Sequence, residues 1–119
     1  MERQFRDRAA RQEEAITALQ KQRKRTESLI QDCFASYKRE QAILDKVLFY
    51  SQGTVTENEA RFRLEDAYQE EEGAKRAFEE GSEELERLVN EHKTALTAVE
   101  DSWTMWKIDQ LKEETHAEN

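Results

Sequence analysis

The complete absence of proline restricts the fold of this chain more than any other feature of its sequence. Proline is the strongest local interruption of an α-helix, and here only residues 51–56, Ser-Gln-Gly-Thr-Val-Thr, have the composition of a turn. The sequence therefore predicts an all-α fold, an antiparallel coiled-coil hairpin in a single domain over residues 1–119. Its expected parts are a first helix over about 2–50, a loop over 51–56 and a second helix over about 57–115.

The composition favours two long helices over a compact globule. Of the 119 residues, 39% are charged, 36% are hydrophobic and 8% are aromatic, a mixture typical of coiled coils. Two helices lying side by side bury an apolar strip and enclose no pocket, so we expect modest stability. We therefore expect association with another protein molecule, a homo-oligomer included.

The first helix carries an almost continuous seven-residue repeat, which is the pattern of a coiled-coil seam. Alternating steps of four and three residues connect Phe5, Ala9, Gln12, Ile16, Leu19, Arg23, Thr26, Ile30, Cys33, Tyr37, Glu40, Leu44 and Val47. Cys33 is then expected to be a buried structural thiol and not a nucleophile. More apolar side chains lie beside this line and predict better packing near the loop: Leu29, Phe34, Ile43 and Leu48.

The repeat of the second helix contains one shift. It runs through Ala60, Leu64, Ala67, Glu71, Ala74, Phe78, Gly81, Leu85, Leu88 and His92, and a shift near Leu96 continues it to Val99, Trp103 and Trp106. Such a shift is a stutter, a local unwinding of the supercoil. Gly73 and Gly81 weaken the helix, and we expect a close contact between the helices there; a flexible joint is the alternative.

Several spacings can define the start of the second helix. The candidate pairs are a capping box (Thr56 and Glu59), a hydrophobic staple (Val55 and Ala60) and a competing frame two residues earlier (Thr54 and Glu57). Gly53 tolerates positive φ and is expected to supply the chain reversal. Folding the chain about Gly53 places Ile30 opposite Phe78 and brings Phe5 near Trp103.

Charge differs between the two predicted helices. Residues 1–50 hold 11 basic and 8 acidic side chains, a net charge of +3, which leaves 8 basic and 19 acidic ones, a net charge of −11, for residues 51–119. Opposite charge favours pairing of the two arms within one chain, because parallel self-association would bring acidic second helices together.

The sequence gives little support for catalysis or metal binding, so we expect a non-enzymatic protein with no cofactor. Glu113 and His116 have the Glu-x-x-His spacing of bundle di-iron sites, but a second copy of the motif is lacking. His92 lies on the seam, where a packed, hydrogen-bonded histidine is the more common finding. The chain has no glycine-rich phosphate loop, no Gly-x-Ser-x-Gly motif and no set of zinc ligands.

A basic segment of the first helix is a candidate partner-binding site, made of Lys21, Arg23, Lys24 and Arg25. The chain is acidic overall and no aromatic residue interleaves this segment to stack on bases, which argues against nucleic acid. An acidic protein partner, or the acidic second helix, is the expected contact. An RNA-binding coiled coil stays as a third alternative, which steep salt dependence of binding would reveal.

Membrane insertion is not expected. The longest apolar run, residues 47–50, is far shorter than the roughly 20 residues that span a bilayer. Met1 is followed by no apolar segment of signal-peptide length, and the single Cys33 has no partner within the chain for a disulfide. These features favour a cytoplasmic protein.

The end of the second helix contains the other candidate partner-binding residues: Trp103, Met105, Trp106 and Ile108. The tryptophans share one helix face, and Met105 with Ile108 forms another apolar ridge. Two interpretations remain open. Either this end anchors a partner, as exposed tryptophans do at interface hot spots, or both rings close the open end of the hairpin.

The layout of the whole chain resembles a known family. A proline-free chain of two long charged helices, with a weak seam and a tryptophan–lysine pattern at Trp103, Trp106, Lys107 and Lys112, is similar to the small stalk proteins of type III secretion, the YscO and FliJ-like family. The resemblance implies a cytoplasmic component of the export apparatus, peripheral to the inner membrane. It also implies that the hairpin engages a hexameric ATPase and contacts the export gate or secretion chaperones.

A second class of function is also consistent with the sequence. A small cytosolic chaperone or adaptor would hold a helical partner through the apolar, tryptophan-rich end. The two classes predict different behaviour, because a stalk should bind or stimulate an ATPase through charged faces, whereas a chaperone should lose its client when Trp103 or Trp106 is replaced by alanine.

Overall fold

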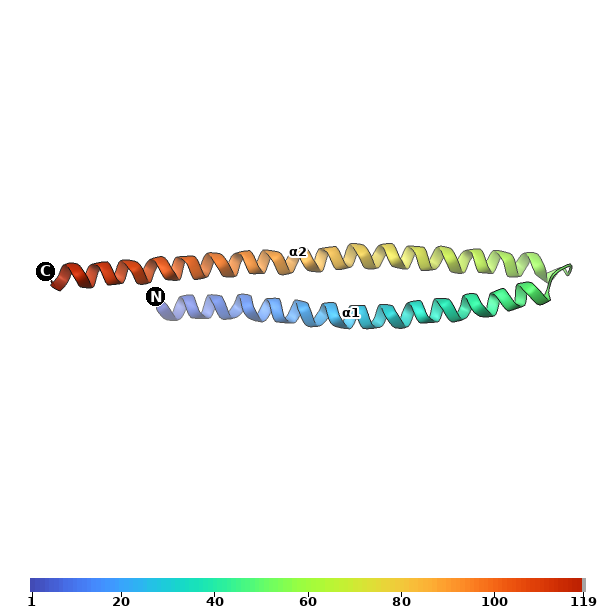
Figure 1. Ribbon diagram of the computed structural model, residues 1–119, viewed down its shortest axis with the longest axis horizontal. Coiled ribbons are helices and arrows are strands. Elements are labelled where there is room, and N and C mark those ends of the chain that lie inside the picture. The colour runs from blue at the N-terminus through green and yellow to red at the C-terminus, as the bar shows by residue number, and fades with distance from the viewer. Residues whose placement is uncertain (119) are drawn as a thin grey trace. The chain divides into compact units, whose positions relative to one another are not determined.

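The computed structural model describes residues 1–118, which form two helices: α1 (Glu2–Tyr50) and α2 (Thr56–Glu118) (Figure 1). The described residues contain no strand, and the predicted all-α helical hairpin is confirmed. The second helix begins at Thr56 and continues past the expected end near residue 115. Within the described residues, neither helix has a stretch long and apolar enough to cross a bilayer.

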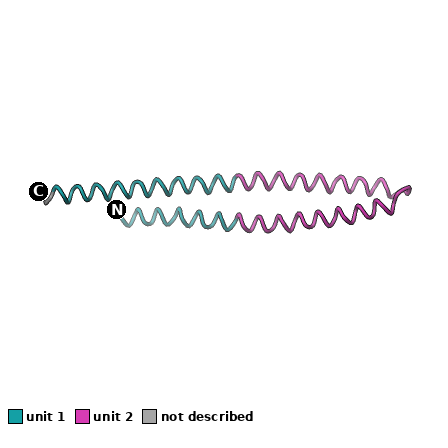
Figure 2. The backbone as a smooth tube through the Cα atoms, viewed as in Figure 1, with its two compact units in different colours: residues 1–22, 84–119 teal, residues 23–83 magenta. Residues whose placement is uncertain are grey.

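The chain forms two compact units, each built from both helices (Figure 2). Unit 2 (Arg23–Glu83, magenta) contains the loop, and its two helical segments run antiparallel on either side of it. Unit 1 (Met1–Gln22 with Glu84 onward, teal) pairs the start of α1 with the later part of α2, again antiparallel. Each unit therefore packs one face of α1 against one face of α2.

The reversal at the loop depends on Gly53, whose φ of 78° lies in the left-handed region that favours glycine. The backbone N–H and the hydroxyl of Thr54 both donate to the carbonyl oxygen of Ser51, at 2.9 and 2.6 Å. The Glu57 carboxylate accepts a hydrogen bond of 3.1 Å from the Gly53 N–H. Glu57 therefore joins the loop to the first turn of α2, close to the earlier of the two predicted frames.

The predicted hydrophobic staple is wrong. Val55 is 92% exposed, although its intended partner Ala60 is buried. The hydrogen bonds that close the turn on the Ser51 carbonyl hold residues 52–54, and the Val55 side chain is exposed to solvent instead of packing on Ala60.

The buried face of α1 departs from the predicted repeat after Ile30. Two successive steps of four residues, from Thr26 to Ile30 to Phe34, replace the predicted step of three to Cys33. The buried and half-buried residues that follow are Tyr37, Gln41, Leu44, Leu48 and Ser51. This shift buries the Phe34 ring in place of the Cys33 thiol, and the neutral Gln41 amide in place of the Glu40 carboxylate, which is the more favourable burial.

A matching shift occurs in α2. Steps of four residues connect Ala74, Phe78 and Ser82, so the phase changes well before Leu96, where the sequence predicts it. The burial pattern then continues through Leu85, Val89, His92, Leu96, Val99, Trp103 and Trp106. Because Phe78 is expected opposite Ile30, both helices of unit 2 change phase at about the same level, and their apolar faces stay together.

The shift overturns three expectations. Cys33 is exposed and is not a buried seam thiol. Leu29 and Ile43, which the sequence predicts to widen the apolar face near the loop, are more than 60% exposed. Gly73 and Gly81 make no close approach, because a Cβ atom added at either position would meet no heavy atom within 4 Å.

A pair of hydrogen-bonded polar side chains is buried in the seam of unit 2. Glu71 is only 4% exposed and accepts a hydrogen bond from the side-chain amide of Gln41, which is also buried. Lys38 and Lys75 place their Nζ atoms 3.2 and 3.5 Å from the Glu71 carboxylate. The Gln41 hydrogen bond and the two lysines lower the pKa of Glu71, although its desolvation opposes them.

Candidate interaction surfaces

An aromatic cluster in unit 1 joins the start of α1 to α2. Phe5, which is buried, lies parallel to Trp103 with ring centroids 6.4 Å apart and contacts Trp106 at 6.1 Å with tilted planes. Both tryptophans are half-buried. The structure therefore places these two predicted partner-binding residues against Phe5, the arrangement in which the rings close this end of the two-helix layer.

Cations surround the Trp103 ring. Lys107 Nζ lies 4.1 Å from its centroid and the Arg6 guanidinium carbon lies 5.9 Å from it, both within cation–π range. The Trp103 indole N–H is buried and donates to no acceptor among the described residues. The Trp103 ring thus packs against an aromatic ring and two cations, and its indole N–H has no hydrogen-bond acceptor among the described residues.

The other predicted apolar ridge of α2 is open to solvent. Met105 is 58% exposed, and Ile108 and Leu111 are also exposed. A shallow groove on this surface is lined by Ile108, Leu111, Lys112, Thr115 and His116. In unit 1, α2 continues here with no described segment of α1 beside it (Figure 1). Leu111 extends the predicted site by one helical turn, and its spacing of three from Ile108 is the signal that identifies it.

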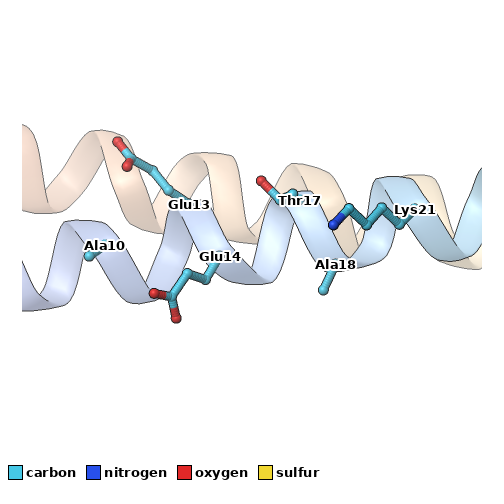
Figure 3. A pocket seen from close by; sticks show the side chains of 6 residues that line it. All are labelled: Ala10, Glu13, Glu14, Thr17, Ala18 and Lys21. Atoms are coloured by element: carbon cyan, nitrogen blue, oxygen red, sulfur yellow. The ribbon is translucent and has the colours of Figure 1, made fainter.

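The basic segment is divided between the two units. Lys21 belongs to unit 1, where it lines a shallow groove on α1 with Ala10, Glu13, Glu14, Thr17 and Ala18 (Figure 3). Arg23 belongs to unit 2 and pairs with Glu27 at 3.4 Å. Lys24 and Arg25 are exposed on the same helix. The surface around Lys21 therefore carries both signs of charge.

Unit 1 also contains charged pairs on the surface of α2 and one polar pair between α1 and α2. Arg87 donates hydrogen bonds to Glu84 and to Glu91 on the surface of α2, which raises the pKa of Arg87 and lowers that of Glu84. His92 Nδ1 lies 2.6 Å from the side-chain oxygen of Gln12. Since an amide oxygen can only accept, Nδ1 carries the proton, and His92 is a hydrogen-bonded seam residue.

A second apolar row, much of which the sequence predicts to be part of the buried seam, is exposed along α1 in unit 2. We call it the outer stripe; its members are all exposed and are Leu29, Cys33, Ser36, Glu40, Ile43, Val47 and Tyr50. At the loop it borders a groove lined by Ile43, Lys46, Val47, Tyr50, Ser51, Thr54 and Thr56. The sequence signal is the alternating spacing of four and three, which two neighbouring lines on α1 satisfy equally well.

No group of three or more His, Cys, Asp or Glu side chains in the described part of the chain is arranged to hold a metal ion. Glu113 and His116, the predicted but disfavoured pair, are both exposed on α2. No protein-family model, curated protein or solved structure matches the chain.

Proposed function

We propose that the protein is a non-enzymatic helical interaction protein that serves as a stalk or assembly component and engages the hexameric export ATPase of a type III secretion apparatus. The observation that carries the proposal is that each unit is a single layer of two helices, whose outer faces bear exposed charges of both signs. Such surfaces suit docking against another protein. The secretion setting rests on the resemblance in layout, and the cytoplasmic location at the inner membrane follows from that setting.

The charged groove on α1 in unit 1 is the surface to test first. Glu13, Glu14 and Lys21 line this groove and are exposed (Figure 3). A partner with complementary charges would approach faster and dock in a defined register. Reversing two of these charges changes the docking surface without removing any buried group.

The experiment measures ATP hydrolysis by a purified export ATPase with and without the protein, together with binding by interferometry. We expect stimulation and binding by the wild type, and loss of both in the variant Glu13→Lys with Glu14→Lys. Lys93→Glu, at an exposed position of α2 outside both candidate surfaces, serves as the charge-reversal control. Absence of both binding and stimulation by the wild type would reject the stalk role.

A second candidate function is a chaperone or adaptor for a helical partner, and the exposed row at the end of α2 favours it. Met105, Ile108 and Leu111 offer exposed apolar surface. An amphipathic helix of a secretion chaperone or substrate would pack its apolar face there.

Ile108→Glu tests this candidate more cleanly than alanine at either tryptophan, because Ile108 is exposed and its replacement leaves the packing on Phe5 intact. Binding of a labelled helical peptide from a secretion chaperone should weaken at least about tenfold, the effect of losing about 1.4 kcal/mol. Gln110→Glu adds the same charge at a neighbouring exposed position and should leave the affinity unchanged.

A further inference from the structure

The outer stripe of α1 has the spacing of a complete coiled-coil seam. Its residues follow one another at alternating intervals of four and three over three heptads, from Leu29 to Tyr50. Five of the seven are apolar when Cys33 is counted: Leu29, Cys33, Ile43, Val47 and Tyr50. From Ile30 onward, each residue of α1 that packs on α2 directly follows a residue of the outer stripe in the sequence. The same segment of α1 therefore carries two adjacent seams.

The outer stripe is unused within unit 2. Leu29 is 69% exposed, Ile43 is 62% exposed and Tyr50 is 82% exposed. Seams of this regularity bury their apolar members against another helix, and an exposed row of large apolar side chains marks an interaction site.

We propose that the outer stripe is a homodimer interface, in which α1 of one copy packs antiparallel against α1 of a second copy around a twofold axis at the level of residue 38. The inference rests on the proposed function only in treating the chain as an interaction protein, and it does not depend on secretion. A twofold axis makes the contact self-complementary, so each pairing occurs twice.

The apolar positions fit this antiparallel arrangement. In an antiparallel register centred on residues 36–40, Leu29 faces Val47 of the second copy, and Cys33 faces Ile43 of the second copy. Each layer thus combines a larger with a smaller apolar side chain, which fills the contact without voids. The symmetric half of the interface repeats both layers.

The centre of the interface is polar and its charges balance. Ser36 faces Glu40 of the second copy, where a hydroxyl can donate to the carboxylate. Arg39, whose guanidinium lies 3.4 Å from Ser36 Oγ in the single chain, flanks this layer. Two glutamates and two arginines then meet at the twofold axis, and such polar residues in a seam fix its register.

Charge complementarity selects a second copy in the antiparallel direction. Asp32 and Lys46 both flank the outer stripe, are exposed and have no ion-pair partner among the described residues. They lie about 21 Å apart along one helix, too far to pair within a chain. In the antiparallel dimer, Asp32 of each copy approaches Lys46 of the other. A parallel dimer in register would instead place Glu40 beside Glu40 of the second copy and would leave Asp32 and Lys46 unpaired.

Sedimentation equilibrium of the full chain tests the proposal. We expect the wild type to shift from monomer to dimer as its concentration rises through the micromolar range. Asp32→Lys alone and Lys46→Glu alone should each raise the dissociation constant several-fold, because each places like charges together. The double variant Asp32→Lys with Lys46→Glu restores opposite charges in both pairs and should recover the wild-type dissociation constant. A double variant that associates no better than the single variants overturns the proposed pairing.

Substitution on the stripe supplies the matched control. Ile43→Glu introduces a charge into an apolar layer of the dimer but lies in solvent in the monomer, so we expect a folded monomer at all concentrations. Phe62→Glu makes an equivalent change at a 67% exposed aromatic residue on α2 and should dimerise as the wild type does. Circular dichroism confirms that both variants keep their helix content. Equal dimerisation of the two variants overturns the proposal.

Disulfide formation tests the direction of the helices. The native Cys33 residues of an antiparallel dimer lie far apart, so the oxidised wild type should not crosslink. Ile43→Cys places a second thiol opposite Cys33 of the other copy, within the distance that a disulfide requires, and should give a covalent dimer. Crosslinking of the wild type through Cys33 would indicate a parallel dimer and overturn the proposal.

These outcomes are separable from those of the proposed function. A wild type that remains monomeric at every concentration overturns the dimer and leaves ATPase stimulation or helical-peptide binding to be decided by its own measurements. Conversely, a dimer that recovers with the charge swap supports this inference even when no export ATPase responds to the protein.

Discussion

The side-chain amide of Gln41 donates a hydrogen bond to the Glu71 carboxylate across the two helices of unit 2, and both residues are buried. A buried carboxylate without a donor is costly, whereas two apolar side chains at the same place are tolerated. The pair therefore ties one level of α1 to one level of α2, and a slip of either helix would leave Glu71 without its amide donor.

Replacing Gln41 by Leu should lower the melting temperature by several degrees, because Glu71 then remains buried with its amide donor removed. Adding Glu71→Leu to this variant should recover most of the loss, since an apolar pair now fills the seam. Thermal unfolding followed by circular dichroism measures both changes. A double variant less stable than the single one would show that the Gln41–Glu71 pair stabilises the folded protein more than two buried leucines do.

Acid should weaken unit 2 through Glu71. Its pKa in the folded state lies below the ordinary 4.5, so the folded protein binds fewer protons than the unfolded chain between these two values. The stabilisation is fully present above pH 4.5 and is lost as pH falls through the folded-state pKa. The difference in melting temperature between the wild type and Glu71→Gln should therefore shrink from pH 6 to pH 3. A difference independent of pH would contradict the lowered pKa.

Replacing glycine by alanine should lower the stability of the folded protein at Gly53 and raise it at Gly73 and Gly81. Gly53→Ala forces a side chain into the left-handed region and should destabilise the protein by about 1 kcal/mol. Gly81→Ala, within α2 and facing open space, should stabilise it by up to about 1 kcal/mol, and Gly73→Ala should do the same. Urea unfolding of the three variants measures these changes. A loss of stability at Gly81 would support the close contact that the sequence predicts and the structure lacks.

The elements of the fold follow directly from the sequence because they depend on local chemistry. An absence of proline and a single turn-like segment with Gly53 suffice for two helices and their reversal. The contact of Phe5 with Trp103 is also predictable, since the position of the turn determines which residues face each other.

The buried face of unit 2 is harder to predict because α1 carries two competing lines. Cys33 and Phe34 both continue a helical stripe from Ile30, at steps of three and four, and a choice between them requires knowledge of the other helix. In the structure, α2 shifts at the same level around Phe78, and Phe34 is the better match. When the line through Phe34 packs on α2, the line through Cys33 is left exposed as the outer stripe. A prediction that lacks the shift therefore cannot identify this surface.

The aromatic cluster of unit 1 should make a large contribution to the folding of that unit. Phe5→Ala removes a buried ring that contacts both tryptophans, and we expect a loss of about 3 kcal/mol, the low end for such truncations, because the site lies near a helix end. Since Trp103 and Trp106 are the two tryptophans of the chain, their fluorescence should shift to longer wavelength as solvent reaches the rings. Gln4→Ala, at the neighbouring exposed position, should leave the emission unchanged.

Thiol labelling decides between the two lines on α1. Cys33 is exposed in the single chain, so at submicromolar concentration, where a dimer is not populated, a maleimide should label it nearly as fast in the folded protein as in urea. Ala67 is 1% exposed, and a Cys33→Ser, Ala67→Cys variant should label at least about a hundredfold more slowly when folded, because labelling then requires opening of the seam. Protection of Cys33 in the dilute wild type would support the uninterrupted repeat that the sequence predicts. It would contradict the shift at Ile30 and the exposure of the outer stripe.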